Sequence, residues 1–230
     1  MNYVIANWKM NPVGVEKSKE LFNSYKESDN VIVCAPYLYL PSLSEIDSEI
    51  KLGAQDSFWE ESGAFTGEVS WSMLEEFCNY VIIGHSERRK LFEDEKMIAQ
   101  KMQFVSESEL TPILCVGETE EERKQGKTEE VLRDQIQKAL SEVSEGSLIV
   151  GYEPRWAIGN DNPCSPQEAG PSALVTRNQL KKEGFDEVPV VYGGSVNSDN
   201  AASYLEFFDG WLIGSASLEP EEINKIIEVA

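Results

Sequence analysis

The chain has 230 residues, of which 41% are hydrophobic, and its 20 basic and 41 acidic residues give a formal net charge of −21 at pH 7. This charge argues against nucleic acid as a partner, because basic contacts to phosphate dominate that affinity, and no apolar run approaches the roughly 20 residues that a membrane helix needs. The N-terminus has no basic region followed by an apolar stretch, so we expect no signal peptide, no membrane partner and a cytoplasmic location.

Short apolar runs typical of strands alternate with longer amphipathic stretches along the whole chain. In order, the predicted strands are Tyr3–Trp8, Val31–Ala35, Ile50–Gln55, Tyr80–Ile83, Thr111–Val116, Leu148–Tyr152, Val188–Tyr192 and Gly210–Ile213. The predicted helices lie near residues 15–27, 38–46, 71–77, 95–107, 128–143, 166–183, 197–206 and 219–228. Strands that are apolar throughout are typical of parallel sheets covered by helices. Eight strand–helix repeats favour an α/β fold of the closed (β/α)8 type, with one domain spanning residues 1–230.

The four cysteines, at positions 34, 78, 115 and 164, lie far apart and show no metal-type pair spacing such as C-x-x-C. Their even number is compatible with disulfides. However, Cys34 and Cys115 lie in apolar, strand-like runs, where free cysteine packs as a small hydrophobic residue. Buried free thiols are therefore the favoured prediction.

Polar residues and glycines follow several predicted strands at the point where the strand ends. They are Asn7 and Lys9 after the first strand, Gly84, His85 and Glu87 after the fourth, Glu153 after the sixth, Gly193, Gly194 and Ser195 after the seventh, and Gly214 and Ser215 after the eighth. In a parallel barrel these strand ends project to one face, where active sites are built. Residues distant in the sequence are therefore expected to meet around one pocket.

Three of these residues can carry acid–base and electrostatic chemistry. Glu153 can take a proton from carbon if a lid excludes water and raises its basicity; the alternative is a solvated carboxylate. His85 is the only histidine, and a helix opening at Ser86 would lower its pKa, so that a neutral ring donates an N–H to a carbonyl; the alternative is a structural histidine. Lys9 would offset substrate charge, or it is a surface lysine.

Two glycine turns, Gly193-Gly194-Ser195 and Gly214-Ser215, follow consecutive strands, the seventh and the eighth. Glycine lets backbone N–H groups approach an anion closely, and a helix that begins near Val196–Ser198 would favour negative charge at its start. One such turn is weak evidence, whereas this pair matches a recurrent phosphate site of barrels. The long connection 154–164 is typical of a lid, although an ordinary surface turn is the alternative.

Several segments, taken together, resemble the triosephosphate isomerase family across nearly the whole chain. They are ANWKMN at 6–11, GAFTGEVS at 63–70, IIGHSERR at 82–89, CVGET at 115–119, YEPRWAIG at 152–159, YGGSV at 192–196 and DGWLIGSASL at 209–218. The resemblance implies a TIM barrel that interconverts dihydroxyacetone phosphate and glyceraldehyde 3-phosphate through an enediolate, with no cofactor and no metal. A Glu base with a neutral His and a closing loop is the family's own assignment.

The resemblance also implies a role for each matching residue. Glu153 would shuttle the proton, and His85 would polarise the carbonyl. Asn7 and Lys9 would contact the substrate, and Glu87 would support Lys9. The phosphate would be bound by Gly159, Ser195, Gly214 and Ser215. The 63–70 loop, Thr66 included, resembles the family's dimer loop, so a homodimer is expected.

Some positions depart from the family pattern. Arg155 replaces a small apolar residue beside the first hinge of the lid, and Pro163 stiffens the second hinge by fixing φ. We therefore hypothesise that the lid kinetics differ from those of relatives. Ser215 stands where a second glycine is common, which leaves the backbone donor in place. The chain is also shorter than the roughly 250 residues typical of such barrels, with trimmed helices near 15–27 and 197–206.

Two other functions remain as alternatives at this point. A different barrel enzyme that binds sugar or indole phosphates would share the two phosphate turns, but its class does not require Lys9, His85 and Glu153 together. A non-catalytic barrel that serves as a binding module would be favoured if one of these three residues were missing, and all three are present.

Overall fold

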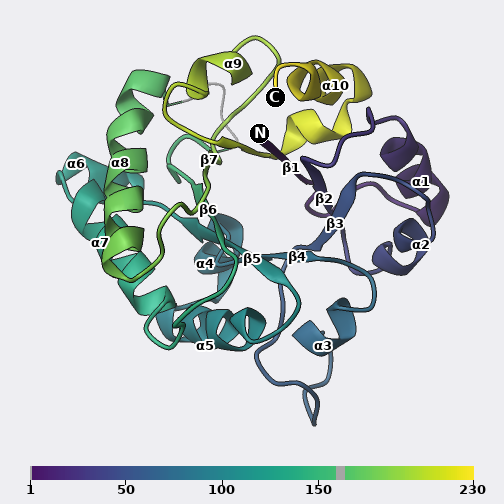
Figure 1. The fold of residues 1–230 in the computed structure, drawn as a ribbon, viewed down its shortest axis with the longest axis horizontal. Coiled ribbons are helices and arrows are strands. Elements are labelled where there is room, and N and C mark those ends of the chain that lie inside the picture. Colours follow the sequence, from purple (N-terminus) through teal and green to yellow (C-terminus); the bar gives the residue numbers. More distant parts are fainter. Residues whose placement is uncertain (1, 159–163) are drawn as a thin grey trace.

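The computed structural model describes residues 2–158 and 164–230, and its eight parallel strands close into a barrel in which each strand pairs with the next and β8 returns to β1 (Figure 1). The strands are β1 (Tyr3–Asn7), β2 (Val31–Cys34), β3 (Lys51–Ala54), β4 (Tyr80–Ile83), β5 (Thr111–Val116), β6 (Ile149–Tyr152), β7 (Val190–Tyr192) and β8 (Gly210–Ile213). Helices surround the barrel, as Figure 1 shows. The predicted (β/α)8 fold is confirmed, and each predicted strand overlaps one observed strand.

The helices of the described residues are more numerous than predicted, and several are shorter. They are α1 (Val15–Asn23), α2 (Leu40–Ser44), α3 (Trp71–Leu74), α4 (Ser86–Leu91), α5 (Glu95–Ser106), α6 (Glu120–Lys124), α7 (Thr128–Ala139), α8 (Pro166–Lys182), α9 (Ala201–Tyr204) and α10 (Pro220–Glu228), with a 3-10 helix η1 (Ser215–Leu218). The additional helix α6 begins at a capping box in which Thr119 and Glu122 each bond the other's backbone N–H.

The helix expected at 197–206 is wrong in its start and length, because α9 begins only at Ala201. Asn197 Oδ1 accepts hydrogen bonds from the backbone of Asp199 at 3.0 Å and of Asn200 at 3.1 Å, and Asn200 Oδ1 accepts one from Asn197 at 3.0 Å. Such side-chain bonds compete with helical ones. The turn after β7 is therefore not followed directly by a helix, contrary to the expectation for Val196–Ser198.

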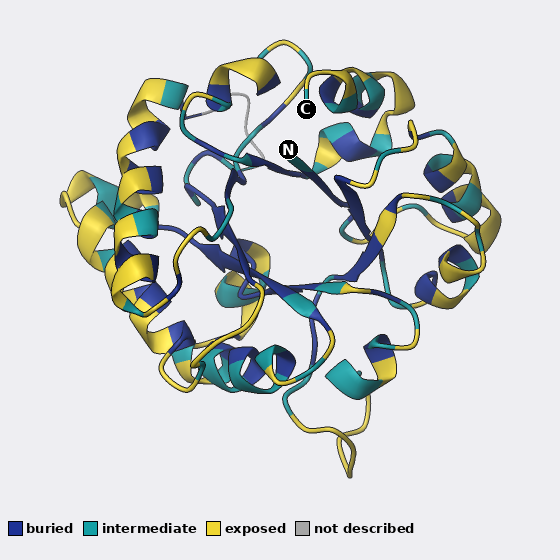
Figure 2. Cartoon of the chain, viewed as in Figure 1, coloured by how far each residue is buried: buried dark blue, intermediate teal, exposed yellow. Residues whose placement is uncertain are grey.

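Apolar side chains fill the barrel and the layer between barrel and helices. Figure 2 shows the strands buried and the outer faces of the helices exposed. The interior of the barrel is filled by side chains from every strand except β3, namely Ile5, Ile32, Cys34, Ile82, Ile113, Cys115, Ile149, Val191 and Leu212. All four cysteines are buried and free, which confirms the prediction of free thiols.

A buried cluster of four charged side chains lies beside β3 and β4. Lys101 of α5 donates to both oxygens of Asp56, at 2.7 and 2.9 Å, and to Glu93. Arg88 of α4 lies 2.6 Å from Asp56 and 2.5 Å from Glu93. Its guanidinium also stacks over Phe92, 4.8 Å from the ring centre. Two cations thus balance two carboxylates in a place where an unpaired charge would be costly.

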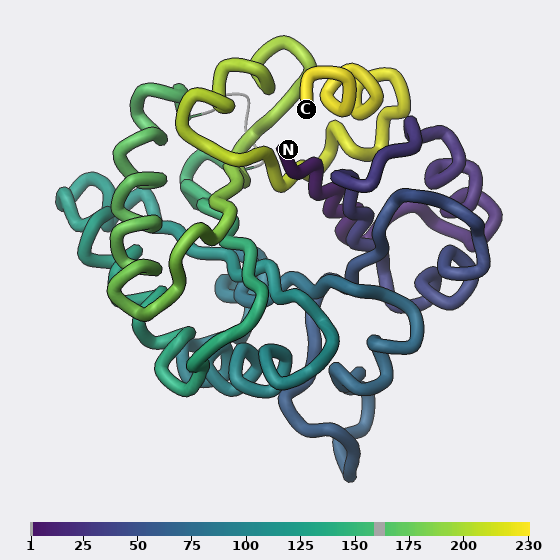
Figure 3. The backbone as a smooth tube through the Cα atoms, in the orientation of Figure 1, coloured from purple at the N-terminus to yellow at the C-terminus, as the bar shows by residue number. Residues whose placement is uncertain are grey.

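The segment between β3 and α3 projects from the otherwise rounded outline of the molecule (Figure 3). Its base is closed where the backbone N–H of Phe58 donates to Val69 at 2.8 Å. Phe58 packs against Phe65 within the loop, with ring centres 4.8 Å apart. Residues 61–68, Thr66 included, are exposed.

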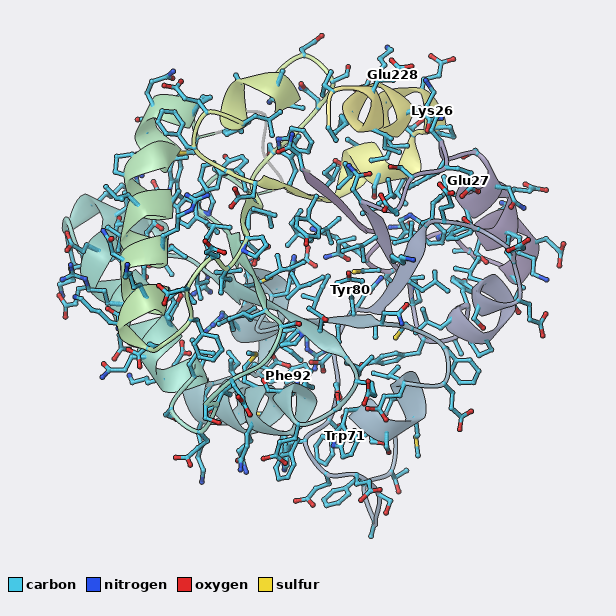
Figure 4. All side chains as sticks on the ribbon, viewed as in Figure 1. Lys26, Glu27, Trp71, Tyr80, Phe92 and Glu228 are labelled. Carbon is cyan, nitrogen blue, oxygen red and sulfur yellow. The ribbon has the colours of Figure 1, made fainter. Side chains whose placement is uncertain are left out.

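The C-terminal helix is joined to the start of the chain. Lys26, which follows α1, pairs with Glu228 of α10, and Figure 4 labels the two side chains close together. Within residues 2–158 and 164–230, no helix is long and apolar enough to span a membrane.

Candidate active site

A pocket of about 970 Å³ opens at the carboxyl ends of the strands. It brings together most of the residues that the sequence singled out. Among its lining residues are Asn7, Lys9, His85, Glu153, Gly193, Gly194, Ser195, Gly214 and Ser215. Glu87 lies beside it, bonded to Lys9. Thr66 does not line it and lies on the projecting loop, and Gly159 lies outside the described residues.

Glu153 follows β6, and its side chain is 2% exposed. One carboxylate oxygen accepts the backbone N–H of Ser86 at 2.8 Å, and the other lies 3.0 Å from His85 Nε2. A Cβ at Gly193 would stand 2.9 Å from Glu153 Cγ, so glycine at that position leaves room for the carboxylate. Burial raises the pKa of Glu153, but His85 and the Ser86 N–H lower it by more, and the net direction is down.

His85 is the N-cap residue of α4, and its Nδ1 accepts the backbone N–H of Glu87 at 3.2 Å. A neutral ring with this bond carries its proton on Nε2, the atom that faces Glu153. Burial lowers the pKa of His85, yet the Glu153 carboxylate raises it by more. The expected lowered pKa is therefore wrong in this structure, because the contact with Glu153 outweighs the helix start and burial.

We predict that His85 titrates above its ordinary pKa of about 6.5 in the wild type and at a lower pH in Glu153→Gln, which removes the carboxylate. A raised pKa stabilises the fold below pH 6.5, and this contribution is lost as pH rises through the folded value. The side-chain NMR signals of the single histidine, followed against pH, measure both values. Identical titrations in the two proteins would contradict the assignment.

Lys9 follows β1 with a left-handed backbone, at φ 53°. Residues other than glycine adopt this conformation at an energetic cost, often at functional sites. Its backbone N–H donates to Asn7 Oδ1 at 3.0 Å, and its Nζ lies 2.6 Å from Glu87. Gln55 donates to the Lys9 carbonyl and to the Cys34 carbonyl, both at 2.9 Å. Gln55 was missed as a supporting residue, although its place at the end of β3 was the available signal.

The two glycine turns face the same pocket from β7 and β8. A Cβ built at Gly214 would meet the Lys9 side chain, 3.4 Å from Cε and 3.7 Å from Nζ, so the ammonium lies against this turn. Ser195 Oγ donates to the Ala157 carbonyl at 2.9 Å, which joins the β7 turn to the segment after Glu153. A cationic side chain and two glycine turns therefore border one space.

The first part of the expected lid packs on a carboxylate for which the sequence predicted no role. Glu118 is fully buried and accepts Trp156 Nε1 at 3.0 Å and the Tyr152 hydroxyl at 3.2 Å. Arg123 stacks over Trp156 at 4.2 Å. Arg155, which departs from the family pattern, is partly exposed, and its backbone N–H donates to the Glu118 carbonyl at 3.1 Å. Pro163 lies outside the described residues.

Comparisons with known proteins identify the family of this chain. The family model described as triosephosphate isomerase matches residues 2–230. The chain is 41% identical to the triosephosphate isomerases of Dictyoglomus turgidum and Aquifex aeolicus, in each case over 97% of this chain and 97% of the relative. It is also 41% identical to that of Hahella chejuensis, over 99% of this chain and 97% of the relative. The chain therefore belongs to the triosephosphate isomerase family.

Proposed function

We propose that the chain interconverts dihydroxyacetone phosphate and D-glyceraldehyde 3-phosphate, with Glu153, His85 and Lys9 as its catalytic residues. Membership of the family supports the reaction. The residue assignment rests on one observation: these three side chains and both glycine turns line one pocket at the carboxyl ends of the strands.

Glu153 is proposed to move the proton between the two substrate carbons. Its present bonds to the Ser86 N–H and to His85 lower its pKa, so a carboxylate that turns from them toward the substrate becomes more basic. Burial acts in the same direction, because it disfavours the charged form. The carboxylate takes a proton from the hydroxyl-bearing carbon beside the carbonyl and returns it to the former carbonyl carbon, while the proton of that hydroxyl passes to the former carbonyl oxygen.

His85 and Lys9 are proposed to stabilise the charge that develops on the substrate oxygens. The Nε2–H of His85, released by Glu153, donates to the carbonyl oxygen as the enediolate forms. The Lys9 ammonium neutralises charge on the substrate, and Asn7 holds the Lys9 backbone through the 3.0 Å bond. Donors and charges placed before the reaction need no reorganisation during it.

Phosphate binding is proposed for the backbone N–H groups of the turns at Ser195 and at Gly214 and Ser215, with Gly159 contributing from the lid. The net charge of −21 does not oppose this proposal, because solvent screens charges beyond about 8–10 Å. The Lys9 ammonium beside Gly214 supplies the local positive charge.

The function is tested by a coupled assay of the purified wild type with glyceraldehyde 3-phosphate. We expect turnover of this substrate, since all three proposed catalytic side chains are present in one pocket. An inactive wild type would contradict the proposed function and leave the alternative of another phosphate-binding barrel enzyme.

We also propose a homodimer that forms through the 63–70 loop and its surroundings. Large apolar side chains are exposed after each of β1 to β4, four neighbouring strands: Met10 and Val13, Leu38, Phe65 and Met73, and Leu91 and Phe92. Exposed apolar patches of this kind mark interfaces. A second copy of the chain fits the resemblance of the loop to the family's dimer loop.

For the dimer, we predict that Leu38→Glu weakens self-association by about tenfold or more, since each 1.4 kcal/mol is a factor of ten. Leu38 is 80% exposed, so the change should leave the fold of each protomer unaffected. The matched control is Leu174→Glu on α8, where the leucine is 61% exposed outside this surface. Sedimentation velocity over a dilution series measures the association. Equal behaviour of the two variants would contradict the proposed interface.

The proposed location is the cytoplasm. Four buried free thiols fit a reducing compartment, where disulfides are rare.

A further inference from the structure

Tyr25 has a buried hydroxyl that joins two parts of the pocket wall. Its side chain follows α1 and is 4% exposed. The hydroxyl accepts the indole N–H of Trp8 at 2.9 Å and donates to the carbonyl of Ser217. Trp8 immediately precedes Lys9, and Ser217 belongs to η1, which begins at Ser215.

The orientation of this hydroxyl is fixed by its partners. An indole N–H only donates, and a backbone carbonyl only accepts. The single hydroxyl proton must therefore point to Ser217, which leaves a lone pair for Trp8. Phenylalanine at position 25 would leave both buried groups without this partner.

The chain of hydrogen bonds continues to the phosphate turn. The backbone N–H of Ser217 donates to the Gly214 carbonyl at 2.9 Å, and its hydroxyl donates to the same oxygen at 2.6 Å. Gly214 in turn lies against the Lys9 side chain. The hydroxyl of Tyr25 thus links the β8 turn to the turn that carries Lys9.

Tyr25 is itself held in place by α10. The Asn224 side chain donates to the Ser24 carbonyl at 2.7 Å and accepts the Lys26 backbone N–H at 2.8 Å. The neighbouring pair of Lys26 and Glu228, labelled in Figure 4, adds a second link. A group whose surroundings are fixed on both sides can position others, because it does not move with them.

We propose that Tyr25 is a positioning residue for the phosphate end of the substrate. It acts through Trp8 on the Lys9 turn and through Ser217 on the Gly214–Ser215 turn, and it does not touch the reacting carbons. The inference rests on the proposed function for the identity of the substrate. We expect the loss of this buried hydroxyl to weaken binding of the phosphate more than it affects the rest of the substrate.

The test is Tyr25→Phe, assayed with glyceraldehyde 3-phosphate, with unphosphorylated D-glyceraldehyde, and for binding of inorganic phosphate by calorimetry. We expect kcat/KM for the phosphorylated substrate to fall about tenfold or more, because small displacements of positioning groups are costly. Phosphate binding should weaken in parallel, while kcat/KM for D-glyceraldehyde falls by less, because only the link to the Lys9 turn bears on a substrate without phosphate. Ser217→Ala, which removes the 2.6 Å bond to Gly214, should act in the same direction.

Tyr39→Phe is the matched control. The Tyr39 hydroxyl also bridges a backbone N–H, that of Gly14 at 3.1 Å, and a carbonyl, that of Pro12 at 2.7 Å. It has no hydrogen bond to η1, so phosphate binding should be unchanged. An equal loss on both substrates, or unchanged phosphate binding in a folded Tyr25→Phe, would overturn the proposal. If the wild type does not isomerise, the proposed function fails, and phosphate binding by the variants still decides the role of Tyr25.

Discussion

Glu153→Gln is expected to lower kcat by about 10²- to 10⁴-fold, the range that a positioned general base contributes. The amide retains one oxygen that can accept the Ser86 N–H, but its NH2 group then faces the Nε2–H of His85, so the variant loses this contact together with the base. We therefore expect a modest loss of stability beside a collapse of turnover. Steady-state kinetics with glyceraldehyde 3-phosphate, alongside thermal unfolding, separates the two effects.

Glu222→Gln is the matched control for this substitution. Glu222 also lines the pocket, and it accepts the backbone N–H of Ser198 at 3.1 Å, a bond that glutamine can keep. We expect little change in turnover there. If Glu153→Gln turned over at the wild-type rate, Glu153 would have no part in the mechanism. A loss of similar size in both variants would show that the negative charge of the pocket in general, and not this base, supports turnover.

Lys101→Met is expected to destabilise the fold by about 3–5 kcal/mol, the usual cost of removing one partner from a buried ion pair. Lys101 is 2% exposed and donates to Asp56 and Glu93. Methionine fills a similar volume but leaves two buried carboxylates with Arg88 alone. Urea unfolding of wild type and variant measures the difference.

The pH dependence of this loss identifies its cause. Burial raises the pKa of Asp56 to about 6, even though Lys101 lowers it. Without Lys101 the pKa of Asp56 rises further. An acid whose folded pKa is raised favours the fold as pH falls, so the deficit of the variant should shrink from pH 7.5 to pH 5.

The exposed pair of Lys138 and Asp134 provides the control for Lys101. Its atoms lie 2.6 Å apart, but both side chains are about half exposed, and such pairs contribute little. Lys138→Met should therefore leave stability nearly unchanged at both pH values. A loss in Lys101→Met that is small, or that does not depend on pH, would mean that the buried cluster is not held by its charges.

The sequence by itself determined the strands and the reacting groups. Apolar runs such as Tyr80–Ile83 are local signals, and the closure of eight of them into a barrel places every strand end on one face. Glu153, His85 and Lys9 could thus be brought together without coordinates. Their residue types and neighbours carried the family resemblance.

Only the tertiary structure decided how these groups are held. The direction of the His85 pKa depends on Glu153, which follows a different strand, and not on the local helix start. The turn after β7 remains a turn because Asn197 and Asn200 bond its backbone. In the sequence, nothing distinguishes Tyr25 from any other residue at the end of an amphipathic helix. Its partners lie 17 and 192 positions away, and contacts at such separations exist only once the chain has folded.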